Sequence, residues 1–286
     1  MIKSEKNESG IIIKGVAGSY TVQTGTSIYT CTPRGIFRKK GTTPLVGDHV
    51  EIEITGQNIG TLHTIKPRKN ELRRPAVSNI DQVIITVATA QPAFNAGLLD
   101  RFLVLAEYEK INAVICVNKN DLENIDFTPY VTAGYPVVYT STINHTGLDN
   151  LRKIMMGKLN VFAGPSGVGK SSLINALAPQ HTLETGDLSI KLGRGKHTTR
   201  HSEIFALGNS PNDGYCVDTP GFTSLETENI PKNELARLFI EFVPLISQCK
   251  FNNCLHNKEI GCAIKAAVGQ EIHPMRYDSY LGLLVV

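Results

Sequence analysis

The sequence predicts an α/β protein in which a doubly wound parallel-sheet domain lies between a small all-β barrel and a mostly helical tail. Three observations predict this fold class. Short strand-like segments fill residues 11–66, strand and helix patterns alternate from residue 81 onward, and three of the six cysteines fall within residues 249–262. Alternating strands and helices are typical of a parallel sheet covered by helices. We therefore expect three domains, over residues 1–72, 73–228 and 229–286.

The N-terminal region contains six short apolar segments and no helical periodicity. Turn-forming Gly, Thr, Pro and Asn residues separate these segments, so each is predicted to be a strand. Five or six strands in about 60 residues fit a small closed barrel, of which the oligonucleotide-binding (OB) fold is one example. The segments are IIIKGVAG, YTVQ, SIYTCT, GIFRKK, LVGDHVEIEI and GTLHTI.

The middle region alternates between buried-strand and helix patterns. The nearly continuous apolar run at 81–90 is expected of a parallel strand with both faces covered. Apolar residues at helical spacing over 98–110 predict the first helix. Further strands are expected at 112–117, 136–140 and 159–164, and further helices at 148–156, 170–178 and 231–247.

The segment GPSGVGKS at 164–171 fits the phosphate-binding pattern G-x-x-x-x-G-K-[ST], with a strand before it and a helix after it. Glycines allow a tight loop whose N–H groups converge on phosphates, and the helix N-terminus adds partial positive charge. Lys170 is predicted to reach the β- and γ-phosphates, and Ser171 to ligate Mg²⁺. The alternative is an ordinary glycine-rich loop. The predicted phosphate-site residues are Gly164, Pro165, Ser166, Gly167, Val168, Gly169, Lys170, Ser171 and Ser172.

A second motif, Asn118-Lys119-Asn120-Asp121, directly follows a predicted strand. The Asp121 carboxylate can accept two hydrogen bonds from guanine N1–H and N2–H₂, whereas adenine has no N1–H and leaves the carboxylate unpaired. Asn118 is predicted to brace the loops and Lys119 to cover the base plane. The alternative is a polar turn. The same alternative applies to Thr140-Ser141-Thr142, which are expected to offer backbone contacts to the base.

Two further segments fit the metal and water loops of a nucleotide hydrolase. Asp218 of DTPG is predicted to hold Mg²⁺ through water, and the Gly221 N–H to sense the γ-phosphate. Thr198 and Thr199 of GRGKHTT, at 193–199, are both candidates for a switch threonine, although this segment also fits a flexible loop. Phe222 stands where Ras-like enzymes carry a water-orienting glutamine, so another group, with His197 as a candidate, or a partner must orient the water. We therefore expect slow hydrolysis by the isolated protein.

The cysteine cluster near the C-terminus has the pattern C-x4-C-x-H-x5-C. Three thiolates and one imidazole fit tetrahedral Zn²⁺ with no open position, which indicates one structural zinc per chain. The tail has few apolar residues, so the metal would replace a hydrophobic core. The alternative is three reduced cysteines beside an incidental histidine. The predicted ligands are Cys249, Cys254, His256 and Cys262.

Positive charge is concentrated in the N-terminal region. Residues 1–74 contain twelve Lys and Arg against six Asp and Glu, a net charge of +6 in a chain whose total is +3. This asymmetry indicates a polyanionic partner, and Tyr20, Tyr29 and Phe37 can stack on RNA bases if they lie on the exposed face. The alternative is solvated cations and core aromatics. Nine of the twelve form two groups that could pair with RNA phosphates: Arg34, Arg38, Lys39 and Lys40, and then Lys66, Arg68, Lys69, Arg73 and Arg74.

The order of the motifs narrows the fold further. NKND precedes GPSGVGKS, which precedes GRGKHTT and DTPG, as in a circularly permuted GTPase. With the barrel before these motifs and the Cys/His cluster after them, the chain closely resembles the bacterial family of GTPases that depend on the small ribosomal subunit. The resemblance covers nearly the whole chain, including RGIFRKK, PRKNELRRPAVSNIDQV, LLDRFLVLAE, DTPGF and CKFNNCLHNKEIGCAI. It implies an OB-type barrel, a permuted GTPase domain and a zinc-binding tail.

The same resemblance implies a role in late maturation of the small ribosomal subunit, with GTP hydrolysis stimulated by that subunit. The expected partners are GTP or GDP, Mg²⁺, and the subunit with its rRNA. A hydrophobic residue at Phe222 also suits the family. The polar N-terminus and the absence of an eighteen-residue apolar run predict a cytoplasmic protein with no membrane contact. We also expect a monomer. The alternatives are a nucleotide-regulated RNA-binding assembly scaffold with incidental hydrolysis, and an ATP-dependent kinase or ATPase, against which Asp121 argues.

Overall fold

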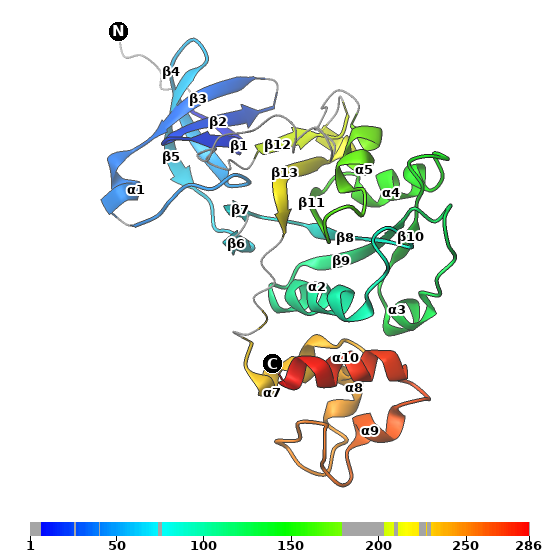
Figure 1. Cartoon of the computed structure of the whole chain (residues 1–286). Helices are drawn as coiled ribbons and strands as arrows, with labels where there is room; N and C mark the ends of the chain where they lie inside the picture. The colour runs from blue at the N-terminus through cyan, green and yellow to red at the C-terminus, as the bar shows by residue number, and fades with distance from the viewer. Residues whose placement is uncertain are drawn as a thin grey trace, which may run out of the picture. The chain divides into compact units, whose positions relative to one another are not determined.

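The computed structural model describes residues 7–25, 27–39, 41–73, 76–178, 203–208, 211–222, 227 and 230–285. The chain divides into two compact units (Figure 1). The first unit contains residues 1–82, 155–161 and 180–222, and the second contains residues 83–154, 162–179 and 223–286.

The first unit contains a closed five-stranded barrel. In it, β1 pairs antiparallel with both β2 and β4, β2 pairs antiparallel with β3, and β5 joins β3 in parallel and β4 in antiparallel register. Alternate residues point inward, so that Ile12, Val22 and Leu62 are fully buried. This pairing confirms the predicted barrel. Its strands are β1 (Asn7–Val16), β2 (Ser19–Thr24), β3 (Ile28–Pro33), β4 (His49–Gly56) and β5 (Ile59–Ile65).

One predicted barrel strand is wrong. The segment GIFRKK forms the short helix α1 (Gly35–Lys39) instead. Its two apolar residues are adjacent, so they cannot form the alternating stripe that a barrel strand needs. The helix buries Phe37, which is 9% exposed, and leaves Ile36 48% exposed. Tyr29 is also buried, so Tyr29 and Phe37 belong to the core and do not lie on an exposed face where bases could stack.

The rest of the first unit extends the sheet from the barrel. Its strand order is β11-β13-β12-β1, and β12 pairs antiparallel with both β13 and β1. The buried Asn160 amide in β11 donates to the carbonyl oxygens of Lys158 and Tyr215, each at 2.9 Å, which fixes β11 beside β13. The elements are β6 (Glu71–Arg73), β7 (Ala76–Ser78), β12 (Glu203–Ala206), η1 (Pro211–Asp213) and β13 (Tyr215–Phe222).

The second unit contains the other part of the sheet, in the order β10-β9-β8-β11, with β11 (Leu159–Ala163) contributing residues to both units. Every residue of β8 is buried, as predicted for a strand covered on both faces. Figure 1 shows α2 and α3 on one side of these strands and α4 and α5 on the other. The elements are β8 (Gln82–Ala88), α2 (Ala96–Tyr108), β9 (Asn112–Asn118), α3 (Thr128–Ala133), β10 (Val137–Tyr139), α4 (Leu148–Met155) and α5 (Lys170–Leu177).

The tail, which lies in the second unit, is helical but more broken than predicted. The helix expected over 231–247 is interrupted at Phe239, whose backbone is extended. Phe239 and Phe242 are fully buried and stacked at 5.1 Å, and Pro244 at the start of α8 has no N–H to continue an earlier helix. The elements are α7 (Lys232–Leu235), η3 (Ala236–Leu238), α8 (Val243–Ile246), α9 (Ala263–Ala267) and α10 (Pro274–Val285).

In the part of the chain that the structure describes, every helix is too short or too polar to cross a bilayer.

Candidate functional site

The glycine-rich loop at 164–169 connects β11 to α5 in a backbone conformation that requires glycine. Gly164 has φ +132° and Gly169 has φ +97°, both in the region that residues with a side chain rarely adopt. Space is restricted as well. A Cβ atom on Gly164 would lie 2.1 Å from the Thr86 carbonyl oxygen, and one on Gly169 would lie 2.3 Å from the Asn118 amide nitrogen. The loop therefore lies directly against β8 and the end of β9.

The lysine of this loop folds back over it. Lys170 Nζ donates to the carbonyl oxygens of Gly164 at 2.8 Å and Pro165 at 2.7 Å. Burial lowers the pKa of the Lys170 ammonium below its ordinary value. Ser171 and Ser172 follow in the first turn of α5, where backbone N–H groups have no partner within the helix. This arrangement offers a cation, two hydroxyls and the N–H groups of a helix N-terminus to an anion.

The NKND segment lies beside this loop. The buried Asn118 amide donates to the Val168 carbonyl oxygen at 2.9 Å and accepts a hydrogen bond from the Thr140 hydroxyl at 3.1 Å. Lys119 Nζ donates to the Gly167 carbonyl oxygen at 2.9 Å and to that of Gln91. The two motifs, which lie about forty residues apart in reversed order, are therefore joined by direct hydrogen bonds.

Asp121 lies at the exposed end of NKND. Thr140 and Ser141, which follow the neighbouring strand β10, are fully buried. The Asn120 N–H donates to the Thr140 carbonyl oxygen at 3.2 Å, so the predicted base-contacting turn does lie next to NKND. The Asp121 carboxylate is thus open to an incoming ligand, on a loop held by buried neighbours.

Sequence reasoning missed the contribution of the loop after β8. The Thr89 hydroxyl donates to the Lys119 carbonyl oxygen at 2.5 Å, and the Gln91 carbonyl accepts from the Lys119 ammonium. Both residues follow the carboxyl end of a strand adjacent to β9, where ligand sites of open α/β sheets are expected. That rule was the available signal, because Thr89 and Gln91 match no motif.

Other predicted site residues are only partly described. Thr198, Thr199 and the rest of 193–199 lie outside the described residues. Asp218 and Gly221 lie in β13, where the Asp218 backbone pairs with Glu203, and nothing is described of their side chains or that of Phe222.

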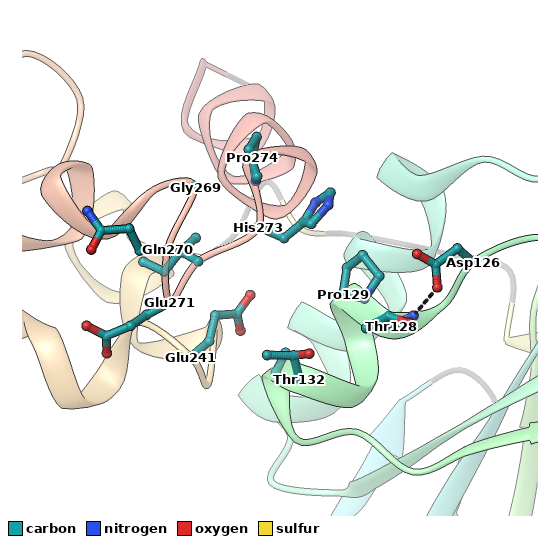
Figure 2. A pocket seen from close by; sticks show the side chains of 12 residues that line it. Asp126, Thr128, Pro129, Thr132, Glu241, Gly269, Gln270, Glu271, His273 and Pro274 are labelled. Carbon is teal, nitrogen blue, oxygen red and sulfur yellow. Dashed lines mark hydrogen bonds between the residues drawn. The ribbon is translucent and has the colours of Figure 1, made fainter.

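A separate pocket of about 200 Å³ lies in the second unit (Figure 2). Thr128, Pro129 and Thr132 of α3 line one side, facing Glu241 and His273 of the tail. The Glu241 carboxylate is already engaged by the Arg276 guanidinium, at 2.6 Å between Oε1 and Nε. No residue of GPSGVGKS or NKND lines this pocket, so it is distinct from the nucleotide motifs.

The predicted metal ligands converge in the tail. The His256 Nδ1 atom lies 3.5 Å from the Sγ atoms of both Cys249 and Cys262, and those sulfurs are 4.0 Å apart. With Cys254 included, all four ligand atoms lie within 4.8 Å of one another. Zn–S bonds of about 2.3 Å in a tetrahedron require S–S edges of roughly 3.8 Å. The set therefore fits Zn²⁺ bound by four protein ligands, with no open position for a substrate.

The basic residues of the barrel region fall into two groups. Three cations are engaged: Arg68 pairs with the fully buried Asp48 at 2.7 Å, Lys69 with Asp81 at 2.5 Å, and Lys14 with Glu203 at 2.7 Å. Arg34, Lys39 and Lys66 are exposed and have no ion-pair partner among the residues that the structure describes. The side chains of Arg38, Lys40, Arg73 and Arg74 are not described.

Comparisons with known proteins agree with this arrangement. The family model described as RsgA GTPase matches residues 65–228, and the RsgA N-terminal domain model matches residues 9–62. A protein of Alkaliphilus metalliredigens named "Small ribosomal subunit biogenesis GTPase RsgA" is 47% identical over 96% of both chains. One of the same name from Caldanaerobacter subterraneus is 46% identical over 96% of this chain and 94% of its own.

Two solved structures are also similar. The crystal structure of YloQ, described as a circularly permuted GTPase, has a TM-score of 0.82 at 37% identity, covering 100% of this chain and 96% of that one. The structure of YjeQ from Thermotoga maritima has a TM-score of 0.84 at 33% identity, covering 98% of each chain. Together with the family-model match over more than half of the sequence, these similarities show that the chain belongs to the RsgA GTPase family of circularly permuted GTP hydrolases.

Proposed function

We propose that this GTPase acts in the late maturation of the small ribosomal subunit, binding the subunit through its rRNA and hydrolysing GTP faster when bound. The observation that carries the proposal is the direct bonding of NKND to the glycine-rich loop, through Asn118 to Val168 and Lys119 to Gly167. One nucleotide can span both segments. The names of the relatives, small ribosomal subunit biogenesis GTPases, support the partner.

The nucleotide is bound by its two ends. Asp121 accepts from the guanine N1–H and N2–H₂ groups, while residues 164–172 receive the phosphates on backbone N–H groups. Lys170 moves from the Gly164 and Pro165 carbonyls to the β- and γ-phosphates, which are stronger acceptors because they are charged. Ser171 ligates the Mg²⁺ that accompanies GTP.

Hydrolysis requires groups that respond to the γ-phosphate. We assign Asp218 to water-mediated Mg²⁺ binding, the Gly221 N–H to the γ-phosphate, and Thr198 or Thr199 to the switch. Phe222 cannot orient water because its ring has no hydrogen-bonding atom. The chain therefore hydrolyses GTP slowly alone, and the bound subunit completes or orders the site.

The barrel supplies the rRNA contact. Arg34, Lys39 and Lys66 carry exposed positive charge that can neutralise RNA phosphates. One Zn²⁺ on Cys249, Cys254, His256 and Cys262 stabilises the tail. We infer a cytoplasmic monomer, since its partner is the small subunit.

A second function is favoured by Phe222 alone: a nucleotide-regulated assembly scaffold whose hydrolysis is incidental. The two are separated by titrating GTP turnover with purified small subunits. The proposed function predicts a several-fold rise that saturates with subunit and is absent in Lys170→Ala. Turnover that is unchanged by subunits, with intact GTP-dependent binding to them, would favour the scaffold.

A further inference from the structure

The predicted metal ligand His256 has an unusual backbone conformation. Its φ is +56°, in the left-handed region that a residue with a side chain rarely adopts. The side chain is 2% exposed, so the residue cannot relax by turning into solvent. Such a conformation is unfavourable for a residue with a Cβ atom and persists only where surrounding contacts impose it.

One carboxylate satisfies the N–H groups on both sides of this residue. Glu259 Oε1 accepts from the Leu255 N–H at 2.8 Å, and Oε2 accepts from the Asn257 N–H at 2.9 Å. These backbone hydrogen bonds lower the pKa of the Glu259 carboxyl below its ordinary value. The carboxylate therefore bonds the backbone before and after His256 and stays ionised.

Two tyrosines of α10 bond carbonyl groups of the same turn. The Tyr277 hydroxyl donates to the His256 carbonyl oxygen and the Tyr280 hydroxyl to that of Leu255, both at 2.7 Å. The Tyr280 ring is fully buried against Phe239 and Phe242, so its hydroxyl is fixed in place. The turn is thus held by four hydrogen bonds from side chains that are not metal ligands.

The helix that carries these tyrosines is itself anchored. Arg276, one residue before Tyr277, is 1% exposed and pairs with Asp100 of α2 and with Glu241. Its guanidinium also lies 4.7 Å from the centre of the Phe239 ring. Because this ion pair joins α10 to α2 within the second unit, it fixes the position of the helix that carries the two tyrosines.

We propose that Glu259, Tyr277 and Tyr280 are positioning residues of the metal site. They hold the turn around His256 so that Nδ1 faces the Cys249 and Cys262 sulfurs at 3.5 Å without needing the metal to bend the backbone. Groups that hold a metal ligand in place without binding the metal raise metal affinity by reducing the ordering that binding requires. This positioning role rests on the proposed zinc site, which zinc binding by the unaltered protein tests separately, and does not depend on the nucleotide chemistry.

The test is zinc affinity of the full-length protein, measured by competition with a chromophoric chelator. Tyr280→Phe and Tyr277→Phe each remove one hydroxyl and keep the ring, and each is expected to weaken binding about fivefold. Glu259→Gln removes the charge and one acceptor and is expected to weaken binding about 10- to 100-fold. Co²⁺ substituted for zinc is expected to give altered d–d absorption in the variants, since the imidazole position changes.

Matched controls separate positioning from general stability. Tyr108→Phe on α2 and Glu271→Gln in the tail change exposed residues of the same types, and both are expected to bind zinc as the parent does. If the three variants lost thermal stability but kept parental zinc affinity and Co²⁺ spectra, the proposal would be overturned. Tyr277 lies nearer the surface than Tyr280, so its variant remains informative even if Tyr280→Phe fails to fold.

Discussion

The nucleotide region and the barrel region hold their cations in different ways. Lys119 and Lys170 donate to backbone carbonyl oxygens of the glycine-rich loop and its neighbours. Arg68, Lys69 and Lys14, by contrast, each donate to a carboxylate. A cation on neutral carbonyls keeps its charge for an incoming phosphate, whereas one on a carboxylate is already neutralised. We therefore expect the partner atom, more than the cation itself, to distinguish a phosphate-binding lysine from a structural one.

The largest expected effect comes from removing Lys170. Its ammonium is proposed to stabilise charge on the β- and γ-phosphates, so Lys170→Ala should lower subunit-stimulated GTP turnover about 100-fold or more. The measurement is phosphate release at saturating small subunits. Folding should be intact, because the lysine rests on carbonyls that water can satisfy. Turnover equal to the parent's would contradict the assignment of this loop.

The next effect concerns the base. Asp121→Asn replaces a double acceptor with one acceptor and one donor, so guanine loses a hydrogen bond and meets an unfavourable contact. GTP affinity should fall about 100-fold. Xanthine carries a carbonyl where guanine has its N2 amine, so XTP affinity should rise. Competition of labelled GTP with XTP and ATP measures both changes. A variant that still preferred GTP over XTP would contradict the assignment of guanine recognition to Asp121.

Arg68 is a cation that is paired with a carboxylate, and its removal should affect stability and not nucleotide binding. Arg68→Ala leaves the fully buried Asp48 without its ion pair, although Ser78 and the Leu45 N–H still donate to that carboxylate. We expect the free energy of unfolding to fall by about 2 kcal/mol in urea denaturation. GTP affinity should be unchanged. Arg68→Lys should recover only part of the loss, because an ammonium cannot bond both Asp48 oxygens in the same geometry.

Local motifs were predictable and long-range partners were not. The glycine spacing of 164–169 predicted a tight loop between a strand and a helix, and the structure has such a loop between β11 and α5, with positive φ at Gly164 and Gly169. The partner of Lys14 lies 189 residues away, at Glu203, and no spacing reveals it. The strand predicted at GIFRKK was wrong. This segment forms the helix α1, which buries Phe37 and leaves Ile36 exposed. The helix predicted over 231–247 failed because Phe239 and Phe242 stack in the core, which interrupts the helix between them.

The smallest expected change in stability belongs to the exposed cations of the barrel region. Arg34 and Lys39 are exposed on and beside α1, so the double variant Arg34→Ala/Lys39→Ala should change the free energy of unfolding by no more than about 0.5 kcal/mol. If these cations contact rRNA phosphates, affinity for the small subunit should fall and the salt dependence of binding should weaken by about one unit of slope per cation.

Lys69→Ala is the matched control, because that ammonium is paired with Asp81 at 2.5 Å. It removes one cation from the same region of the chain, yet the salt slope should stay as in the parent. An equal loss of subunit affinity per removed cation in the two variants would mean that the barrel region acts through its total charge. A loss confined to the Arg34→Ala/Lys39→Ala variant would mean that the carboxylate partners determine which cations are available to bind RNA.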